Sequence, residues 1–162
     1  RLRGLGSRPF DAEGLTGKAI NIIDDGVLTT WLLDTRSANQ LGLHSTAHAV
    51  RGTSSAPSPG PSNLYMMAGD LSKDDLIAGI NNGFYVTEMM GMSFNGLTGD
   101  YSRGASGFWI DNGTITFPVN EMTVAGNVVD MFAHSTPAND LRFRYATNAP
   151  TTRVDGMTVA GT

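Results

Sequence analysis

The sequence predicts an α+β fold, with a mainly antiparallel β-sheet (barrel- or sandwich-like) and two or three short helices. Three observations lead to it: apolar runs of strand length recur, Gly-containing turns separate them, and few segments have helical spacing. The clearest element is Gly107–Val119, where Asn112-Gly113 interrupts alternating apolar residues. Asn-Gly between such runs is typical of a two-residue hairpin turn.

Other strands are expected on the same grounds. Ala19–Asp34 contains two β-rich runs around Asp24-Asp25-Gly26, which indicates a second hairpin. Gly83–Met90 is also rich in strand-forming residues. In Asp140–Thr147, apolar side chains alternate with arginines, the period of a half-buried strand.

Three segments have helical features. Thr35–Leu43 predicts a short helix capped by Asp34 or Thr35. Ser72–Ile80 begins with a capping signal, because Asp75 follows Ser72 by three residues. Gly126–Ser135 spaces its apolar residues at helical intervals.

Length and composition restrict the class of protein. We expect residues 1–162 to form one domain, since 162 residues with 40% hydrophobic and 16% charged residues suit one ordinary globular core. The net charge of -4 disfavours a nucleic-acid surface, which needs a basic face. No apolar run approaches the roughly 18 residues of a membrane span. Cysteine is absent, which excludes disulfides and thiolate ligands and favours a cytoplasmic location.

Two segments lack a strong structural signal. Val50–Asn63, rich in Pro, Gly and Ser, is interpreted as a surface loop. Residues 1–18 are expected to be irregular. The pentapeptide Met-Thr-Val-Ala-Gly occurs at 122–126 and again at 157–161, and two equivalent strand ends would explain it.

The His44-Ser45-Thr46-Ala47-His48 run is the most obvious metal candidate. Two histidines four residues apart on a helix can share a zinc ion. A zinc protease would need Glu beside the first histidine, where Ser45 stands, and no third ligand is near in sequence. We therefore interpret His44 and His48 as histidines near a surface loop and reject a metal site.

The Gly- and Ser-rich run "GDYSRGASGFW" (Gly99–Trp109) offers no familiar catalytic pattern. Ser106 lacks the Gly-x-Ser-x-Gly spacing of a nucleophile elbow, and no phosphate-loop pattern is present. Arg103 could bind a carboxylate, although a structural ion pair, for example with Asp100, is the role we favour. In Phe10–Gly14 two carboxylates lie two residues apart, for which a solvated or turn role is preferred over metal binding.

The stretch "YVTEMMGMSFNGLTGDYSRGASGFWIDNGTITFPVNEMTVAGN" resembles the carboxy-terminal part of the TldD/PmbA family, also called the modulator of DNA gyrase family. Further stretches of the resemblance are "RPFDAEG", "DDGVLTTWLLDTRSANQLGLHST", "PSNLYM" and "RVDGMTVAG". Together they cover nearly the whole chain in the family's order. We therefore expect a carboxy-terminal domain of a longer protein.

The resemblance implies a cytoplasmic metalloprotease assembled from two kinds of subunit and acting on peptides and unfolded chains. The catalytic kind carries His-Glu-x-x-x-His and a late Cys that completes its zinc site. The run from Asp100 to Ala105 and the absence of Cys look like the other kind, the PmbA (TldE) type. Zinc is then expected on a TldD-type partner and no cofactor in this chain. A heterodimer or self-association, a peptide substrate, no membrane and no nucleic acid are expected.

The leading hypothesis is a non-catalytic partner domain that contributes a subunit interface and part of a peptide cavity. Its proposed contact residues are Asp100, Ser102, Arg103, Gly104, Ser106 and Trp109. Whether the chain is itself an enzyme stays open, since it carries no recognisable catalytic set. One alternative is a fragment of a catalytic zinc subunit whose helix lies upstream. Another is a binding or scaffold domain without a proteolytic role.

Overall fold

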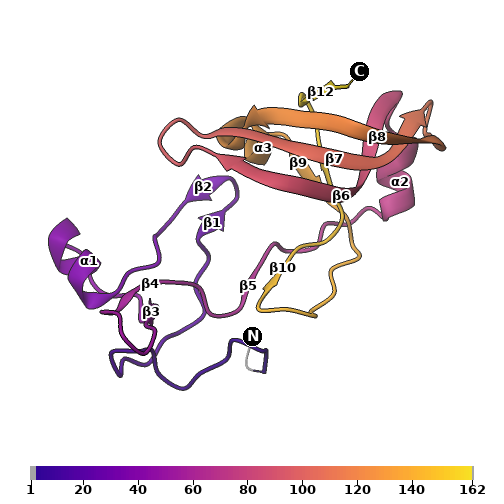
Figure 1. The fold of residues 1–162 in the computed structure, drawn as a ribbon. Coiled ribbons are helices and arrows are strands. Elements are labelled where there is room, and N and C mark those ends of the chain that lie inside the picture. Colours follow the sequence, from indigo (N-terminus) through magenta and orange to yellow (C-terminus); the bar gives the residue numbers. More distant parts are fainter. Residues whose placement is uncertain (1–2, 162) are drawn as a thin grey trace. The chain divides into compact units, whose positions relative to one another are not determined.

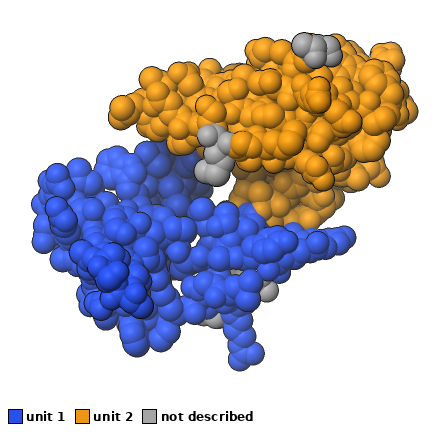
Figure 2. Space-filling view, viewed as in Figure 1, with its two compact units in different colours: residues 1–65, 142–148 blue, residues 66–141, 149–162 orange. Residues whose placement is uncertain are grey.

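A computed structural model describes residues 3–161, apart from the side chain of Met92. The chain divides into two compact units (Figure 2). Unit 1 comprises Arg1–Tyr65 and Arg142–Asn148, and unit 2 comprises Met66–Leu141 and Ala149–Thr162. None of the helices in the described part of the chain is long and apolar enough to cross a membrane.

Unit 1 is built from short two-stranded pairs and one helix (Figure 1). Its elements are β1 (Ile23–Asp24), β2 (Val27–Leu28), α1 (Thr35–Leu41), β3 (Ala49–Val50), β4 (Ser58–Pro59), β5 (Leu64–Tyr65) and β10 (Thr147–Asn148). The pairs β1–β2 and β3–β4 are antiparallel, whereas β5 and β10 are parallel.

Two local predictions for unit 1 are confirmed. The β1–β2 turn has positive φ at Asp25 (48°) and Gly26 (76°), as a two-residue hairpin of this kind requires. Helix α1 begins after Asp34, whose carboxylate accepts a 2.7 Å hydrogen bond from the Ser37 N–H. It ends at Gly42 in the left-handed conformation that glycine adopts without strain.

Unit 2 is dominated by one antiparallel sheet of strand order β12–β8–β7–β6 (Figure 1). Its elements are α2 (Lys73–Ala78), β6 (Asn82–Phe94), β7 (Asp100–Asp111), β8 (Thr114–Asn127), α3 (Val128–Ala133), β9 (Ser135–Pro137), β11 (Thr152–Val154) and β12 (Thr158–Ala160). The predicted α+β class, the mainly antiparallel pairing and the short helices are confirmed. The sheets are not closed into a barrel.

The β7–β8 turn packs against the end of α2. Asn112 and Gly113 have φ of 46° and 78°, which confirms the predicted turn. The Gly113 N–H donates to the Ile80 carbonyl at 2.8 Å, and a Cβ at Gly113 would lie 2.8 Å from the Ala78 carbonyl oxygen. Glycine is therefore required here by both conformation and space.

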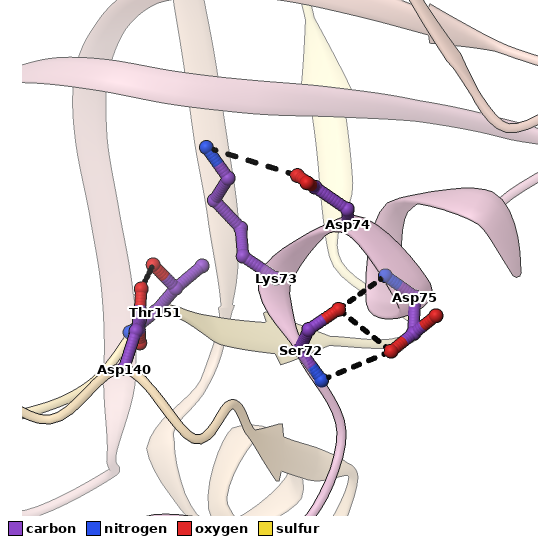
Figure 3. Close-up of polar contacts among 6 residues, drawn as sticks. All are labelled: Ser72, Lys73, Asp74, Asp75, Asp140 and Thr151. Carbon is purple, nitrogen blue, oxygen red and sulfur yellow. Dashed lines mark hydrogen bonds and ion pairs between the residues drawn. The ribbon is translucent and has the colours of Figure 1, made fainter.

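Helix α2 has the predicted capping box (Figure 3). The Asp75 N–H donates to Ser72 Oγ at 3.1 Å, while the Asp75 carboxylate accepts from the Ser72 N–H at 3.2 Å. At its other end, Arg153 donates to the Gly79 carbonyl at 3.2 Å. Both ends of this six-residue helix are thus satisfied by side chains.

The two Met-Thr-Val-Ala-Gly copies pair with each other. In the β8–β12 ladder, Val124 lies opposite Val159, and the register places each copy antiparallel to the other. A Cβ on Gly126 would lie 3.8 Å from Met157 Cε, and one on Gly161 would collide with Met122. Each copy therefore ends in a glycine that leaves room for the methionine beginning the other copy.

The prediction of a half-buried strand over Asp140–Thr147 is wrong. Only Thr147 belongs to a strand, β10, and the preceding residues form an irregular turn. The buried Asn148 side chain accepts from the N–H groups of Arg144 (2.8 Å) and Tyr145 (2.9 Å) and donates to the Tyr145 carbonyl. This side chain satisfies backbone groups that a sheet ladder would otherwise have paired.

Candidate functional site

The run Gly99–Trp109 lies almost entirely in β7, an inner strand of the sheet. Strand β7 pairs with β6 on one side and β8 on the other. Its backbone hydrogen-bonding edges are therefore occupied by neighbouring strands, and only its side chains are available to a ligand or partner.

Bulges in the neighbouring strands preserve the alternation of β7. The β6–β7 register shifts between Val86 and Glu88 and again between Met90 and Ser93, where Gly91 has φ of 70°. The β7–β8 register shifts near Glu121, which has φ of 56°. The extra residues lie in β6 and β8, so successive side chains of β7 alternate regularly between the two sides of the sheet.

Residues opposite one another in the ladders share a side, which defines two faces of the sheet. Face A carries Glu88, Met90, Ser102, Gly104, Ser106, Thr123, Ala125, Thr158 and Ala160. Face B carries Met89, Tyr101, Arg103, Ala105, Gly107, Trp109, Val124 and Gly126.

The six predicted contact residues are divided between these faces. Face A has the small and acidic members, namely Asp100, Ser102, Gly104 and Ser106. Face B has Arg103 and Trp109. A single flat partner surface against β7 could therefore touch one group or the other, but not both.

Face A is open over its middle. Apart from Glu88 and Met90 of β6, its residues in that region are small, and all are at least partly exposed; Met90 is 51% exposed. Face B is covered more fully, since Ala105 has no exposed surface and Val124 is 4% exposed. On that face a Cβ at Gly126 would lie 3.5 Å from Met131 of α3.

The expected ion pair between Arg103 and Asp100 is not formed. The two side chains lie on opposite faces, and Asp100 instead accepts a 2.7 Å hydrogen bond from Thr98 Oγ1. Within residues 3–161, the buried Nε of Arg103 has no hydrogen-bond partner. A guanidinium in this state can bind a carboxylate, because its planar donors match the two carboxylate oxygens.

Trp109 is held in place by β6. Its indole Nε1 donates to Asn82 Oδ1 at 3.0 Å, and its ring lies 6.3 Å from that of Phe84. Sequence reasoning did not identify Asn82, because only the ladder register brings it opposite the start of the hairpin turn. Trp109 is therefore a positioned aromatic side chain on face B.

The histidine pair does not share a helix face. The segment from Leu43 to His48 is not helical, His44 is exposed and His48 is 8% exposed. His48 Nδ1 lies 2.7 Å from the Thr46 carbonyl oxygen and therefore donates to it. Among residues 3–161, no three His, Cys, Asp or Glu side chains gather as a metal site would need.

The carboxylates of Asp11 and Glu13 both bind backbone amides. Asp11, which is 4% exposed, accepts from the N–H groups of Glu13 and Leu15 at 2.9 Å and of Ala49 at 3.0 Å. Glu13 accepts from the Thr35 N–H at 2.8 Å. Burial raises the pKa of Asp11, but the amide hydrogen bonds outweigh it, so its pKa lies below the ordinary value. The bonds to Glu13 and Leu15 show the predicted turn role, whereas the prediction of a solvated role is wrong for Asp11, because its carboxylate is buried and also binds the distant Ala49 N–H.

Comparison with known proteins agrees with this architecture. Residues 1–161 match the family described as the PmbA/TldA metallopeptidase C-terminal domain. Metalloprotease PmbA of Escherichia coli O157:H7 is 42% identical over 99% of this chain and 34% of its own length. A metalloprotease TldD homolog of Haemophilus influenzae is 30% identical over 78% of this chain and 27% of its own length.

A solved structure has the same fold. The crystal structure of a protein from Bacteroides thetaiotaomicron, titled a modulator of DNA gyrase, superposes with a TM-score of 0.84 at 36% identity. The superposition covers 98% of this chain and 34% of that one. The chain thus spans about a third of the length of these relatives, and it belongs to the PmbA/TldA metallopeptidase C-terminal domain family.

Proposed function

We propose that this chain is the carboxy-terminal domain of a PmbA-type, non-catalytic subunit of a cytoplasmic metallopeptidase complex. In this proposal a TldD-type partner carries the zinc and hydrolyses peptides or unfolded chains. The higher identity to the relative named PmbA than to the one named TldD supports the subunit type.

The openness of face A is the observation that supports a role in binding a partner subunit or a peptide. Ser102, Gly104 and Ser106 project little, so the backbone of a partner subunit or a peptide can approach the sheet closely. Within the described residues β6 is paired only with β7, so its outer edge could accept an extended peptide through backbone hydrogen bonds. Such binding is tolerant of sequence, as a peptidase of broad specificity requires.

Arg103, which is half-buried, supplies a second, separate contact on face B. Its guanidinium, whose buried Nε has no hydrogen-bond partner among the described residues, binds a carboxylate of the peptide or of the partner in this proposal. Because Arg103 and Gly104 point to opposite faces, each can be tested without directly altering the other surface.

The experiment is Gly104→Val in the full-length protein, assayed for assembly and peptide cleavage with its catalytic partner. A Cβ at Gly104 would lie 3.6 Å from Met90 Cβ, an ordinary contact, so the fold should tolerate valine. We expect loss of assembly and turnover, with Ala149→Val at an exposed position as the control. Arg103→Ala should reduce cleavage, and Arg103→Lys should restore it only partly.

Unchanged assembly and cleavage in both Gly104→Val and Arg103→Ala would reject the interface role. Zinc in the purified full-length subunit without its partner would favour the catalytic alternative. Failure to associate with any metallopeptidase subunit would favour a scaffold domain.

A further inference from the structure

The loop joining β6 to β7 presents an apolar tip on a backbone held by hydrogen bonds. Leu97, at its apex, is 99% exposed, and Phe94, at the end of β6, is 61% exposed. A Cβ on Gly96 would lie 3.8 Å from the Phe94 ring. We define Phe94 and Leu97 as the tip.

Hydrogen bonds within the loop fix its backbone. The Asn95 N–H donates to the Asp100 carbonyl at 2.9 Å, and the Gly99 N–H donates to the Asn95 carbonyl at 2.8 Å. Asn95 Oδ1 accepts from the N–H groups of Leu97 at 2.9 Å and Thr98 at 3.3 Å. A loop ordered in this way loses little conformational entropy on binding, which favours a role as an anchor.

The loop is also tied to the neighbouring strand. Asn127 Nδ2 donates to the Thr98 carbonyl at 2.9 Å, and the Val128 N–H donates to the Gly99 carbonyl at 2.8 Å. These bonds come from the end of β8 and the start of α3. Leu97 is thus exposed at the end of a hairpin whose backbone is held by hydrogen bonds from β8 and α3.

Unit 1 contains a largely apolar cleft that could accept an apolar side chain such as Leu97. It has a volume of about 270 Å³ and is lined by Leu28, Trp31, Leu33 and Leu43, with two threonines and a histidine. Trp31 and Leu28 are 51% and 54% exposed. An apolar cavity of about 150 Å³ can hold a benzene ring. The cleft is therefore large enough for a leucine side chain.

The charges of the two units favour contact between copies. Unit 1 has eight Lys and Arg against five Asp and Glu, a net charge of +3. Unit 2 has three against ten, a net charge of -7. Attraction between the cleft-bearing unit of one copy and the tip-bearing unit of another speeds and orients their encounter.

We propose that the tip of one copy docks into the Trp31 cleft of a second copy, and that the contact is reciprocal. A two-fold pair makes this contact twice, once in each direction. The inference deepens the proposed subunit role, on which it rests, by naming a surface and an occupant distinct from face A.

The test measures self-association of the full-length protein without its catalytic partner, by sedimentation velocity over a concentration series. We expect Leu97→Ser to weaken dimerisation at least tenfold, because exposed Leu97 contributes to binding and little to folding. Trp31→Ala should weaken it similarly. Met67→Ser, at a 70% exposed residue elsewhere in unit 2, should leave it unchanged.

A mixing experiment is more specific. Leu97→Ser retains the cleft and Trp31→Ala retains the tip, so a mixed dimer regains one intact contact of the two. We expect the mixture to dimerise more tightly than either variant alone. Absence of this rescue, or a wild-type protein that stays monomeric at every concentration, overturns the inference. The proposed function is tested separately, because Gly104→Val is read by cleavage with the catalytic partner.

Discussion

Units 1 and 2 are stabilised in different ways. All four buried polar or charged residues among those described lie in unit 1: Asp11, Asp34, His48 and Asn148. Each has hydrogen bonds to backbone groups of nearby turns or helix ends. No polar or charged residue described in unit 2 is buried as a whole, and its buried residues are apolar or glycine, around a sheet that supplies its own backbone pairing.

The difference follows from strand length. The strands of unit 1 are two residues long, so many backbone groups lack a ladder partner and rely on side chains. The strands β6, β7 and β8 have 13, 12 and 14 residues and satisfy one another. Replacing one buried polar side chain should therefore destabilise unit 1, whereas removing one buried apolar side chain should destabilise unit 2.

The largest effect is expected for Asp11→Ala. It would leave the buried Ala49 N–H without its acceptor, at a cost of about 1–3 kcal/mol, and would also remove the acceptor of two partly buried N–H groups, those of Glu13 and Leu15, at about 1 kcal/mol each. We expect a total loss of about 4 kcal/mol, confined to unit 1. Fluorine NMR of 5-fluorotryptophan during urea unfolding separates the units, since Trp31 lies in unit 1 and Trp109 in unit 2. An equal loss at both tryptophans would show that the units do not unfold separately.

A somewhat smaller effect is expected for Ile110→Ala in unit 2. Ile110 is 2% exposed, and removing its side chain leaves a cavity that should cost about 3 kcal/mol. The Trp109 signal should then report earlier unfolding than the Trp31 signal. Ile115→Ala is the control, because Ile115 lies opposite Ile110 on face A but is 39% exposed. Comparable losses in the two variants would argue against packing as the main support of this sheet.

Lowering the pH should destabilise unit 1 before unit 2, with a smaller effect on stability than either substitution above. Hydrogen bonds from Ser37 hold the pKa of Asp34 below its ordinary 3.8, and the pKa of Asp11 is also lowered. The folded state then favours the ionised carboxylates. Their stabilisation is complete above the unfolded pKa and disappears as pH falls through the folded pKa.

Asp75 and Asp140 of unit 2 also have a lowered pKa, because they accept hydrogen bonds from Ser72 and Thr151 (Figure 3). Both residues are exposed, so solvent screens their contributions. We therefore expect the Trp31 signal to lose native dispersion at a higher pH than the Trp109 signal. Asp34→Asn keeps a capping side chain and removes the titration, so it should reduce this difference. The reverse order of unfolding would contradict the assignment of buried carboxylates to unit 1.

Local chemistry made much of the fold predictable. Asp25-Gly26 and Asn112-Gly113 provide the positive φ values that their turns need, and Ser72 with Asp75 forms a cap within four residues. The family was also recognisable from long stretches of sequence. The α+β class depends on the same short-range signals.

Short-range signals did not predict which residues of the site share a face of the sheet. Whether Arg103 shares a side with Asp100 depends on strand alternation, and which β6 or β8 residues join each face depends on bulges near Thr87, Gly91 and Glu121. The burial of Asp11 depends on Ala49, 38 residues away. The strand predicted over Asp140–Thr147 is absent except at Thr147, because the Asn148 side chain hydrogen-bonds the backbone of Arg144 and Tyr145, and the alternation of residue types does not reveal this competition.

The most direct test of the central claim, that face A is the partner contact, uses two adjacent methionines. Met90 lies on face A and is 51% exposed, while Met89 lies on face B and is 45% exposed. We would measure hydroxyl-radical oxidation of both by mass spectrometry, in the full-length protein alone and with its catalytic partner. The account predicts strong protection of Met90 and little change at Met89. Protection of Met89 with Met90 still reactive would contradict it, as would equal reactivity of both residues with and without the partner.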